Sequence, residues 1–366
     1  MDNITHTLFA LTLARTPLGR AGRGATAALV LASNAPDIDV VTSVRGMQHY
    51  LTWHRGPTHG PIGVVGLGLI VGALVGLVLR LVPPREGDHE DASFRLLVPI
   101  AMIGVLLHIL MDLPTSYGTR LLSPFDWHWF AVDWMPIIDV YLLVVLAAGL
   151  LFGGRSAVAR RRNAAIVLVL MTANYGVRAV AHRAALANAP RLFGPALPPA
   201  CSLLPSTSHA VDRWPLGSEA HSGGPAGRCL VELVAIPTFL SPFSWRAVAH
   251  LSNAYEIHDV DLLDARFRRP WDETAGMWRT TYRLPNVWTP PVWTAASTKL
   301  GQIFLGFARL PAARSFVDST GTATVRWTDL RFIGARMALA PPRNDPFGIV
   351  VRIAPDGRVL DERLGP

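Results

Sequence analysis

Three short motifs contain side chains that could bind a divalent metal ion. They are residues 36–39 (Pro-Asp-Ile-Asp), residues 54–59 (His-Arg-Gly-Pro-Thr-His) and the pair His108 and Asp112. Imidazole nitrogens and carboxylate oxygens are ligands of Zn²⁺ in proteins. A metal ion held in this way can activate water and polarise an ester, so the chemistry to consider is hydrolysis.

His108 and Asp112 lie four residues apart in an otherwise apolar stretch. On a helix this spacing puts both side chains on one face, roughly 6 Å apart. Ionisable residues within apolar spans are functional candidates. The alternative is a structural His–Asp hydrogen bond inside a helical bundle.

The other two motifs are expected to form loops. In extended backbone Asp37 and Asp39 point to the same side, so both carboxylates could face one ion or two adjacent ions. His54 and His59 flank a Gly-Pro turn that could aim both rings inward, and Arg55 is suited to a phosphate or carboxylate group. The alternatives are an ordinary Asx-Pro turn and a polar interfacial loop.

The composition indicates that these motifs belong to a membrane protein. Of the 366 residues, 50% are hydrophobic and only 16% are charged, whereas soluble proteins carry about 25% charged residues. The formal net charge is +8, but the arginines fall in short clusters beside apolar stretches rather than on one basic face. That pattern specifies membrane topology, and we expect no nucleic-acid partner.

Six apolar stretches are candidate membrane spans, and we expect an α-helical membrane bundle of four to six spans, with six favoured. A span needs about 20 apolar residues, so residues 61–82 and 136–153 are the clearest, and the two N-terminal stretches are short. The six stretches are residues 4–17, 24–35, 61–82, 96–113, 136–153 and 164–187.

Arginine placement predicts which side of the membrane each loop occupies. With six alternating spans, the connections at residues 15–23, 80–95 and 155–162 share one side, and their arginines mark it as cytoplasmic. The metal-ligand motifs, the N-terminus and the C-terminal part then lie outside the cytoplasm. His6 and Asp139 fall on that same face, so they join the candidate ligands. No cleavable signal peptide is recognisable, so we expect His6 in the mature protein.

The chain is expected to divide into three parts. Residues 1–187 form the helical membrane domain with the metal site, residues 188–228 form a loop-rich linker, and residues 229–366 form a small extracytoplasmic β-rich domain. Turn signals separate the strand-like runs of this last part, at residues 230–236, 247–251, 278–284, 322–327 and 348–353. Cys201 and Cys229 could form a disulfide in an oxidising compartment or stay unlinked.

The ordered motifs resemble those of a bacterial inner-membrane family of membrane-bound, metal-dependent hydrolases, some of which are LexA-regulated. The matching blocks are Asp2-Thr5-His6, Pro36-Asp37-Asp39, His54-Arg55-Thr58-His59, His108-Asp112, Ser116-Tyr117-Gly118-Thr119 and Pro124-Phe125, all within residues 1–150. The His-x-x-x-Asp element is similar to a helix motif of zinc-dependent phospholipases C. Carried over by position, the resemblance implies the ligands His6, Asp37, Asp39, His54, His59, His108, Asp112 and Asp139.

The resemblance implies a bacterial inner-membrane enzyme with one or two divalent ions, and Zn²⁺ is the ion we expect. We expect it to hydrolyse a phosphate or carboxylic ester of a membrane lipid or lipid-linked substrate. Asp39 or Asp139 would act as the general base, and Arg55 would neutralise the developing oxyanion. Two alternatives stay open: a non-enzymatic metal or ion transporter, and a membrane-anchored binding scaffold.

Overall fold

The chain forms two compact units in a computed structural model. The first contains residues 1–42 and 53–179, and the second contains residues 43–52 and 180–366. The structure describes residues 1–84, 89–154, 156–189, 192–193, 197–201, 211–216, 229–264, 282–332 and 347–365. Most of the expected linker at residues 188–228, and the first part of the expected strand at 278–284, lie outside these ranges.

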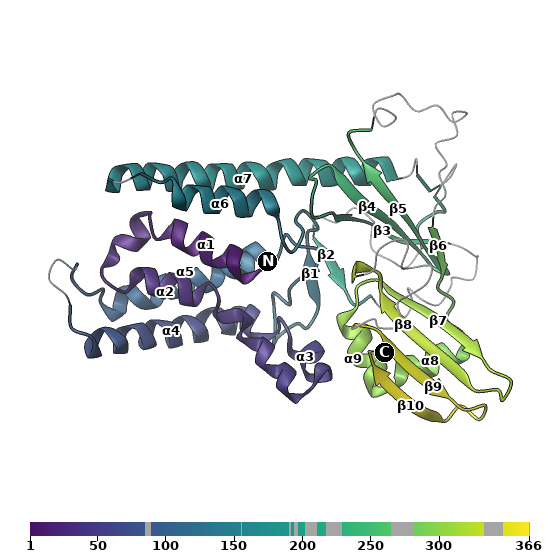
Figure 1. Cartoon of the computed structure of the whole chain (residues 1–366). Coiled ribbons are helices and arrows are strands. Elements are labelled where there is room, and N and C mark those ends of the chain that lie inside the picture. The colour runs from purple at the N-terminus through teal and green to yellow at the C-terminus, as the bar shows by residue number, and fades with distance from the viewer. Residues whose placement is uncertain are drawn as a thin grey trace. The chain divides into compact units, whose positions relative to one another are not determined.

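The first unit is helical (Figure 1). Its elements, in chain order, are α1 (Asn3–Leu13), η1 (Pro17–Ala21), α2 (Ala25–Ala32), η2 (Ala35–Arg45), η3 (Pro57–His59), α4 (Pro61–Leu81), α5 (Phe94–Asp112), β1 (Trp129–Ala131), α6 (Val140–Leu151) and α7 (Ala157–Asn188). The boundary between the two units falls within η2 and within α7. Helix α3 (Met47–Trp53) belongs almost entirely to the second unit.

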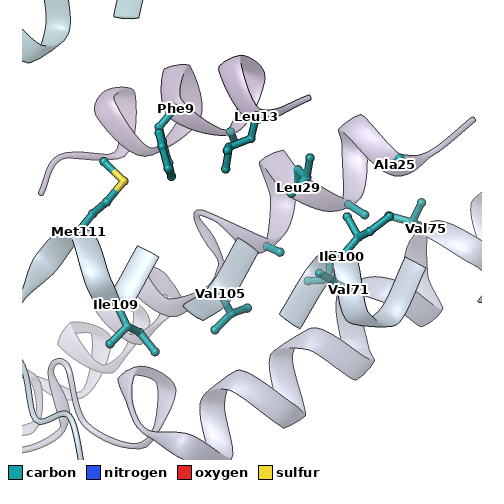
Figure 2. Close-up of a cluster of buried hydrophobic side chains, with 14 of the residues drawn as sticks. Phe9, Leu13, Ala25, Leu29, Val71, Val75, Ile100, Val105, Ile109 and Met111 are labelled. Carbon is teal, nitrogen blue, oxygen red and sulfur yellow. The ribbon is translucent and has the colours of Figure 1, made fainter. Parts of the chain in front are cut away.

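The core of the first unit is a cluster of apolar side chains from several helices. Figure 2 shows Phe9 of α1, Leu29 of α2, Val71 of α4 and Val105 of α5 within it. Helices α6 and α7 add side chains such as Leu146 and Val167 to the same cluster. In a membrane such packing is stabilised by van der Waals contact rather than by the exclusion of water.

Glycines bring α4 and α5 into close contact. A Cβ atom at Gly68 would lie 3.0 Å from Cα of Met102, and one at Gly72 would lie 2.9 Å from Cα of Val98. Residues four apart lie on one face of a helix, so Gly68 and Gly72 form the small-xxx-small pattern that lets membrane helices approach closely. Gly68 meets Met102 and Gly72, further along α4, meets the earlier residue Val98, so the two helices run antiparallel and the end of α5 meets the start of α4.

Fewer helices can cross a membrane than the sequence suggested. Within the described residues, α4, α5 and α7 are long and apolar enough, and α2 with η2 forms a fourth span if the pair, bent by 42°, is counted as one. Six spans are not supported. Helices α1, α2 and α6 contain 11, 8 and 12 residues. At 1.5 Å per residue they extend about 12–18 Å, well short of the hydrocarbon thickness of about 30 Å.

The arginine-bearing connections meet at one end of the first unit. Arg15 donates to the carbonyl oxygens of Gly149 and Leu150 at 2.9 and 2.8 Å, which satisfies the C-terminal end of α6. Arg23 pairs with Asp91 at 2.5 Å. This end lies at the end of α4 and the start of α5, so it is opposite to the end that contains the histidine motifs. Arg155 lies outside the described residues.

The second unit is rich in β-structure, as the sequence predicted. One antiparallel sheet has the order β3 (Leu230–Pro237), β4 (Ser244–Leu251), β5 (Ala254–Asp261), β6 (Tyr282–Pro285). A second has the order β10 (Val359–Leu364), β9 (Ile349–Ile353), β8 (Ala323–Asp329), β7 (Pro311–Val317). The unit also contains β2 (Asp212–Trp214), α8 (Pro290–Ser297), α9 (Lys299–Phe307) and η7 (Leu330–Phe332).

Tight turns join the strands of this unit. Gly321 and Gly357 have φ angles of 80° and 84°, which favour glycine, and they lie in the β7–β8 and β9–β10 turns. The helices α8 and α9 pack on the second sheet, where Phe304 stacks on Trp327. Cys201 and Cys229 form a disulfide, which decides between the two alternatives that the sequence left open.

Candidate metal centre

Four of the predicted ligands converge where η2, η3 and α5 meet. Asp37, His59, His108 and Asp112 each offer one ligand atom, and these atoms all lie within 4.8 Å of one another. His59 and Asp112 are fully buried and His108 is 1% exposed. The helical spacing of His108 and Asp112 therefore does place both side chains at one point, as the sequence predicted.

The separations among these atoms suit a small tetrahedral ion. Nε2 of His59 lies 3.6 Å from Oδ1 of Asp37 and 3.6 Å from Oδ2 of Asp112. Nε2 of His108 lies 3.6 and 3.5 Å from the same two oxygens, and 3.2 Å from Nε2 of His59. Bonds of about 2.0–2.1 Å to Zn²⁺ would put tetrahedral ligand atoms about 3.3 Å apart.

The outer hydrogen bonds leave both Nε2 atoms with a lone pair for a cation. Nδ1 of His108 lies 2.8 Å from the carbonyl oxygen of Ser33, which can only accept, so Nδ1 carries the proton. Nδ1 of His59 lies 3.0 Å from Oγ1 of Thr58, and because that hydroxyl donates its proton to Oδ2 of Asp39 at 3.3 Å, its oxygen accepts from Nδ1. Burial lowers the pKa of His59 to about 3, so its ring is neutral at neutral pH. Two imidazole lone pairs and two carboxylate oxygens thus face one another, and the residues fit a divalent metal ion.

Asp39 and His54 lie beside the four-residue group and pair with each other. Nδ1 of His54 is 3.1 Å from Oδ1 of Asp39. Oδ2 of Asp39 accepts from the backbone N–H of Arg55 at 2.6 Å and from Oγ1 of Thr58 at 3.3 Å. Arg55 has a φ angle of 50°, an uncommon conformation for a side chain other than glycine. Asp39 therefore holds the loop of residues 54–59 in this conformation.

Arg55 points into the same cluster. Its Nη2 lies 2.9 Å from Oδ2 of Asp112, and its Nη1 donates to the carbonyl oxygen of Gly118 at 2.8 Å. The guanidinium also lies over the ring of Tyr117, 4.7 Å from its centroid. These contacts fix a cationic fork at the edge of the candidate metal position.

His6 lies against the cluster from α1. Its ring stacks on that of His108 with 3.9 Å between centroids, and its Nε2 lies 3.4 Å from Oδ1 of Asp112. The amino group of Met1 pairs with the same oxygen. In the described part of the chain neither ring nitrogen of His6 makes a hydrogen bond, so His6 is placed beside the four residues with its donor atoms uncommitted.

Asp139, like His6, Asp39 and His54, is a predicted ligand outside the group of four, and its contacts lie with other residues. It begins α6, where Oδ1 accepts from the N–H of Leu142 at 2.7 Å and from Nδ2 of Asn174 at 3.2 Å. Its other oxygen pairs with Arg178 of α7. Arg178 was not among the predicted site residues, although an arginine within an apolar span requires a partner of this kind. The carbonyl oxygen of Ser33, which contacts His108, was not predicted either, because no side chain indicates it.

These features define a multi-pass membrane protein with a buried His/Asp cluster that could hold a metal ion. The family model described as "YdjM inner membrane protein" matches residues 1–185, which include the whole cluster. The chain therefore belongs to the YdjM inner membrane protein family, and the resemblance drawn from the motifs is confirmed.

A similar protein is "Uncharacterized protein YfhP" of Bacillus subtilis (strain 168). It is 28% identical over 117 residues, which are 32% of this chain and 33% of YfhP. The similarity thus spans about a third of each protein. No solved structure matches the chain.

Proposed function

We propose that this chain is a metal-dependent hydrolase of the bacterial inner membrane, which cleaves a phosphate or carboxylic ester of a lipid or lipid-linked substrate. The observation that supports this most is the group of four buried ligand atoms on Asp37, His59, His108 and Asp112. Their separations of 3.2–3.6 Å and the proton positions on the two rings favour a cation.

Asp37, His59, His108 and Asp112 would hold the ion, and we propose Zn²⁺ because nitrogen and carboxylate ligands at these separations are typical of it. When bound, such an ion supplies the Lewis acidity that activates water and polarises an ester. A second ion would use His6 and Oδ1 of Asp112, where it would replace the amino group of Met1 that pairs with this oxygen.

The side chains around the group have distinct roles in this proposal. Arg55 places its guanidinium where negative charge develops on the ester oxygens, as a fixed cation in a buried site does. His54, oriented by Asp39, would accept the proton of the attacking water as the general base. A carboxylate that orients an imidazole through Nδ1 is a common arrangement for this role. Asp139 is committed to Arg178, so we assign it no proton transfer.

We further propose that the site faces the outside of the cytoplasmic membrane. It lies at the end of α4 and α5 opposite to Arg15 and Arg23, and arginine-rich connections favour the cytoplasm. The disulfide between Cys201 and Cys229 supports the same assignment for the second unit, because disulfides persist in oxidising compartments. A site at the end of a membrane bundle suits a substrate whose apolar tail stays in the bilayer.

The test is the activity of the full chain purified in detergent, with its metal content measured alongside. We expect hydrolysis of a phospholipid or a lipid-linked phosphate, which is lost on chelation and restored by Zn²⁺. A preparation that contains the metal but cleaves no member of a broad panel of lipid esters would overturn the proposal. Metal uptake by reconstituted vesicles in the absence of hydrolysis would instead assign transport.

A further inference from the structure

Arg178 is a fully buried cation in the C-terminal half of helix α7, a candidate membrane span. Its side chain has no exposed surface, and Val177 and Val180 are its apolar neighbours along the helix. A charged side chain in such a position is costly, so it is retained where it has a function. None of the roles assigned above uses Arg178.

The partners of Arg178 occupy only part of its guanidinium. Its Nη2 pairs with Oδ2 of Asp139. In the described part of the chain, Nε and Nη1 make no hydrogen bond. Oδ1 of Asp139 accepts from Leu142 and Asn174 instead. Among the described residues, one edge of this buried guanidinium therefore has no hydrogen-bond acceptor, and an anionic oxygen ligand would supply one.

A short chain of contacts links Arg178 to the candidate metal centre. Tyr175 precedes Arg178 by three residues, and residues at this spacing lie on one helix face. The hydroxyl of Tyr175 donates to Sδ of Met1 at 3.6 Å, and the amino group of Met1 pairs with Asp112. Arg178 thus lies in the same unit as the metal ligands, and Tyr175 and Met1 connect its helix to Asp112.

We propose that Arg178 binds a phosphate group of the substrate, with Asp139 as the positioning residue that fixes the orientation of the guanidinium. The planar fork of arginine matches two phosphate oxygens in a way that lysine cannot, and such charge-assisted pairs are strong. The proposal rests on the proposed function for the identity of the substrate, and it selects a phosphate ester over a neutral carboxylic ester.

The experiment measures phosphate binding by the full chain in detergent, as the rise in its unfolding temperature with increasing inorganic phosphate. Arg178→Gln is expected to weaken binding by more than about tenfold, because it removes a charge-assisted bidentate pair, and Arg178→Lys to weaken it less. Metal content should stay at the wild-type value in both. Arg183→Gln, an exposed arginine of the same helix, is the matched control.

A variant that removes both partners guards against misfolding. Asp139→Asn/Arg178→Gln leaves no unpaired buried charge, and it should keep its metal while losing phosphate binding. An unchanged phosphate dissociation constant in this folded double variant would overturn the proposal. A preparation that binds phosphate through Arg178 and shows no hydrolysis would contradict the proposed function but support the phosphate site.

A second arm distinguishes a lipid headgroup from free phosphate. Mixed micelles that contain phosphatidic acid are compared with micelles that contain diacylglycerol, which has the same tails and no phosphate. Stabilisation by phosphatidic acid alone, lost in Arg178→Gln, supports a lipid source. Arg178-dependent binding of inorganic phosphate without any response to phosphatidic acid would overturn the lipid assignment.

Discussion

Nε2 of His59 and Nε2 of His108 lie 3.2 Å apart, although 48 residues separate them in the sequence. His59 immediately precedes the short connection to α4, and His108 lies in the last turns of α5. Their meeting depends on the antiparallel packing of the two helices, which is set by Gly68 and Gly72. The geometry of the candidate metal centre is therefore a property of the helix pair as well as of the ligands.

Removal of a ligand should release the metal. We expect His108→Ala and Asp112→Ala to lower the metal affinity of the purified chain by at least about 100-fold, because even residues behind the ligands contribute 10–100-fold. Elemental analysis by mass spectrometry measures the content. His89→Ala, which changes an exposed histidine, should leave the metal content unaltered. Equal metal content in all three variants would contradict the assignment of the metal site.

The glycine contact between α4 and α5 should control the same site from a distance. Gly72→Ala places a methyl group against the backbone of Val98, and such overpacking costs about 1–3 kcal/mol. We expect a lower unfolding temperature and weaker metal binding. Gly66→Ala is the matched control in the same helix, because no described atom beyond its own stretch of helix lies within 4 Å of the position of its Cβ. Equal effects of the two substitutions would contradict this account.

Replacement of Arg55 should separate turnover from metal binding. Arg55→Lys keeps the charge but loses the fork that reaches Asp112 and Gly118. Loss of one such transition-state donor lowers kcat by about 10²–10³, while the four ligands remain. The measurement is kcat beside metal content, with Arg45→Lys, an exposed arginine, as control. Loss of metal together with activity would show that Arg55 is structural.

Asp139 should affect stability rather than metal content. Asp139→Asn leaves Arg178 as an uncompensated buried charge, and breaking a buried pair from one side costs about 3–5 kcal/mol. The double variant Asp139→Asn/Arg178→Gln should recover part of this loss. Thermal unfolding measures the stability. If Asp139→Asn instead lost its metal at an unchanged unfolding temperature, Asp139 would be a ligand, as its sequence position first indicated.

The disulfide should stabilise the second unit. Cys201 and Cys229 are separated by 28 residues, and closing a loop of that length stabilises a folded domain by about 3–4 kcal/mol in the chain-entropy estimate. Cys201→Ser should lower the unfolding temperature of this unit. Mass spectrometry of non-reduced peptides checks the pairing, and free thiols in protein isolated from cells would place these residues in a reducing compartment.

Much of the site could be predicted because its signals are local. The i,i+4 spacing of His108 and Asp112 implies one helix face, and polar motifs between apolar stretches imply loops at a membrane surface. The role of Asp139 could not be predicted, because its partner Arg178 is 39 residues away in the sequence. The orientation of His108 depends on a backbone carbonyl, which no residue type encodes.

The fold was predictable to a similar depth. Apolar stretches located the helices, but hydropathy does not show that α1, α2 and α6 end after 8–12 residues. These helices are apolar because they pack in the helical core. Their apolar sequences alone do not distinguish such short core helices from membrane spans. In the second unit β2, β5, β7 and β10 were not predicted. The sequence of β5, Ala254–Asp261, mixes polar and apolar residues without regular alternation.

The antiparallel pairing of α4 and α5 couples the metal centre to the register of the two helices. One step along a helix is about 1.5 Å, close to the length of a metal–ligand bond of about 2 Å. A slide of one helix past the other by a single residue would therefore move His59 out of reach of an ion bound to His108. Metal coordination at this site therefore depends on the relative position of α4 and α5 along their axes, and this position is fixed where Gly68 and Gly72 contact α5.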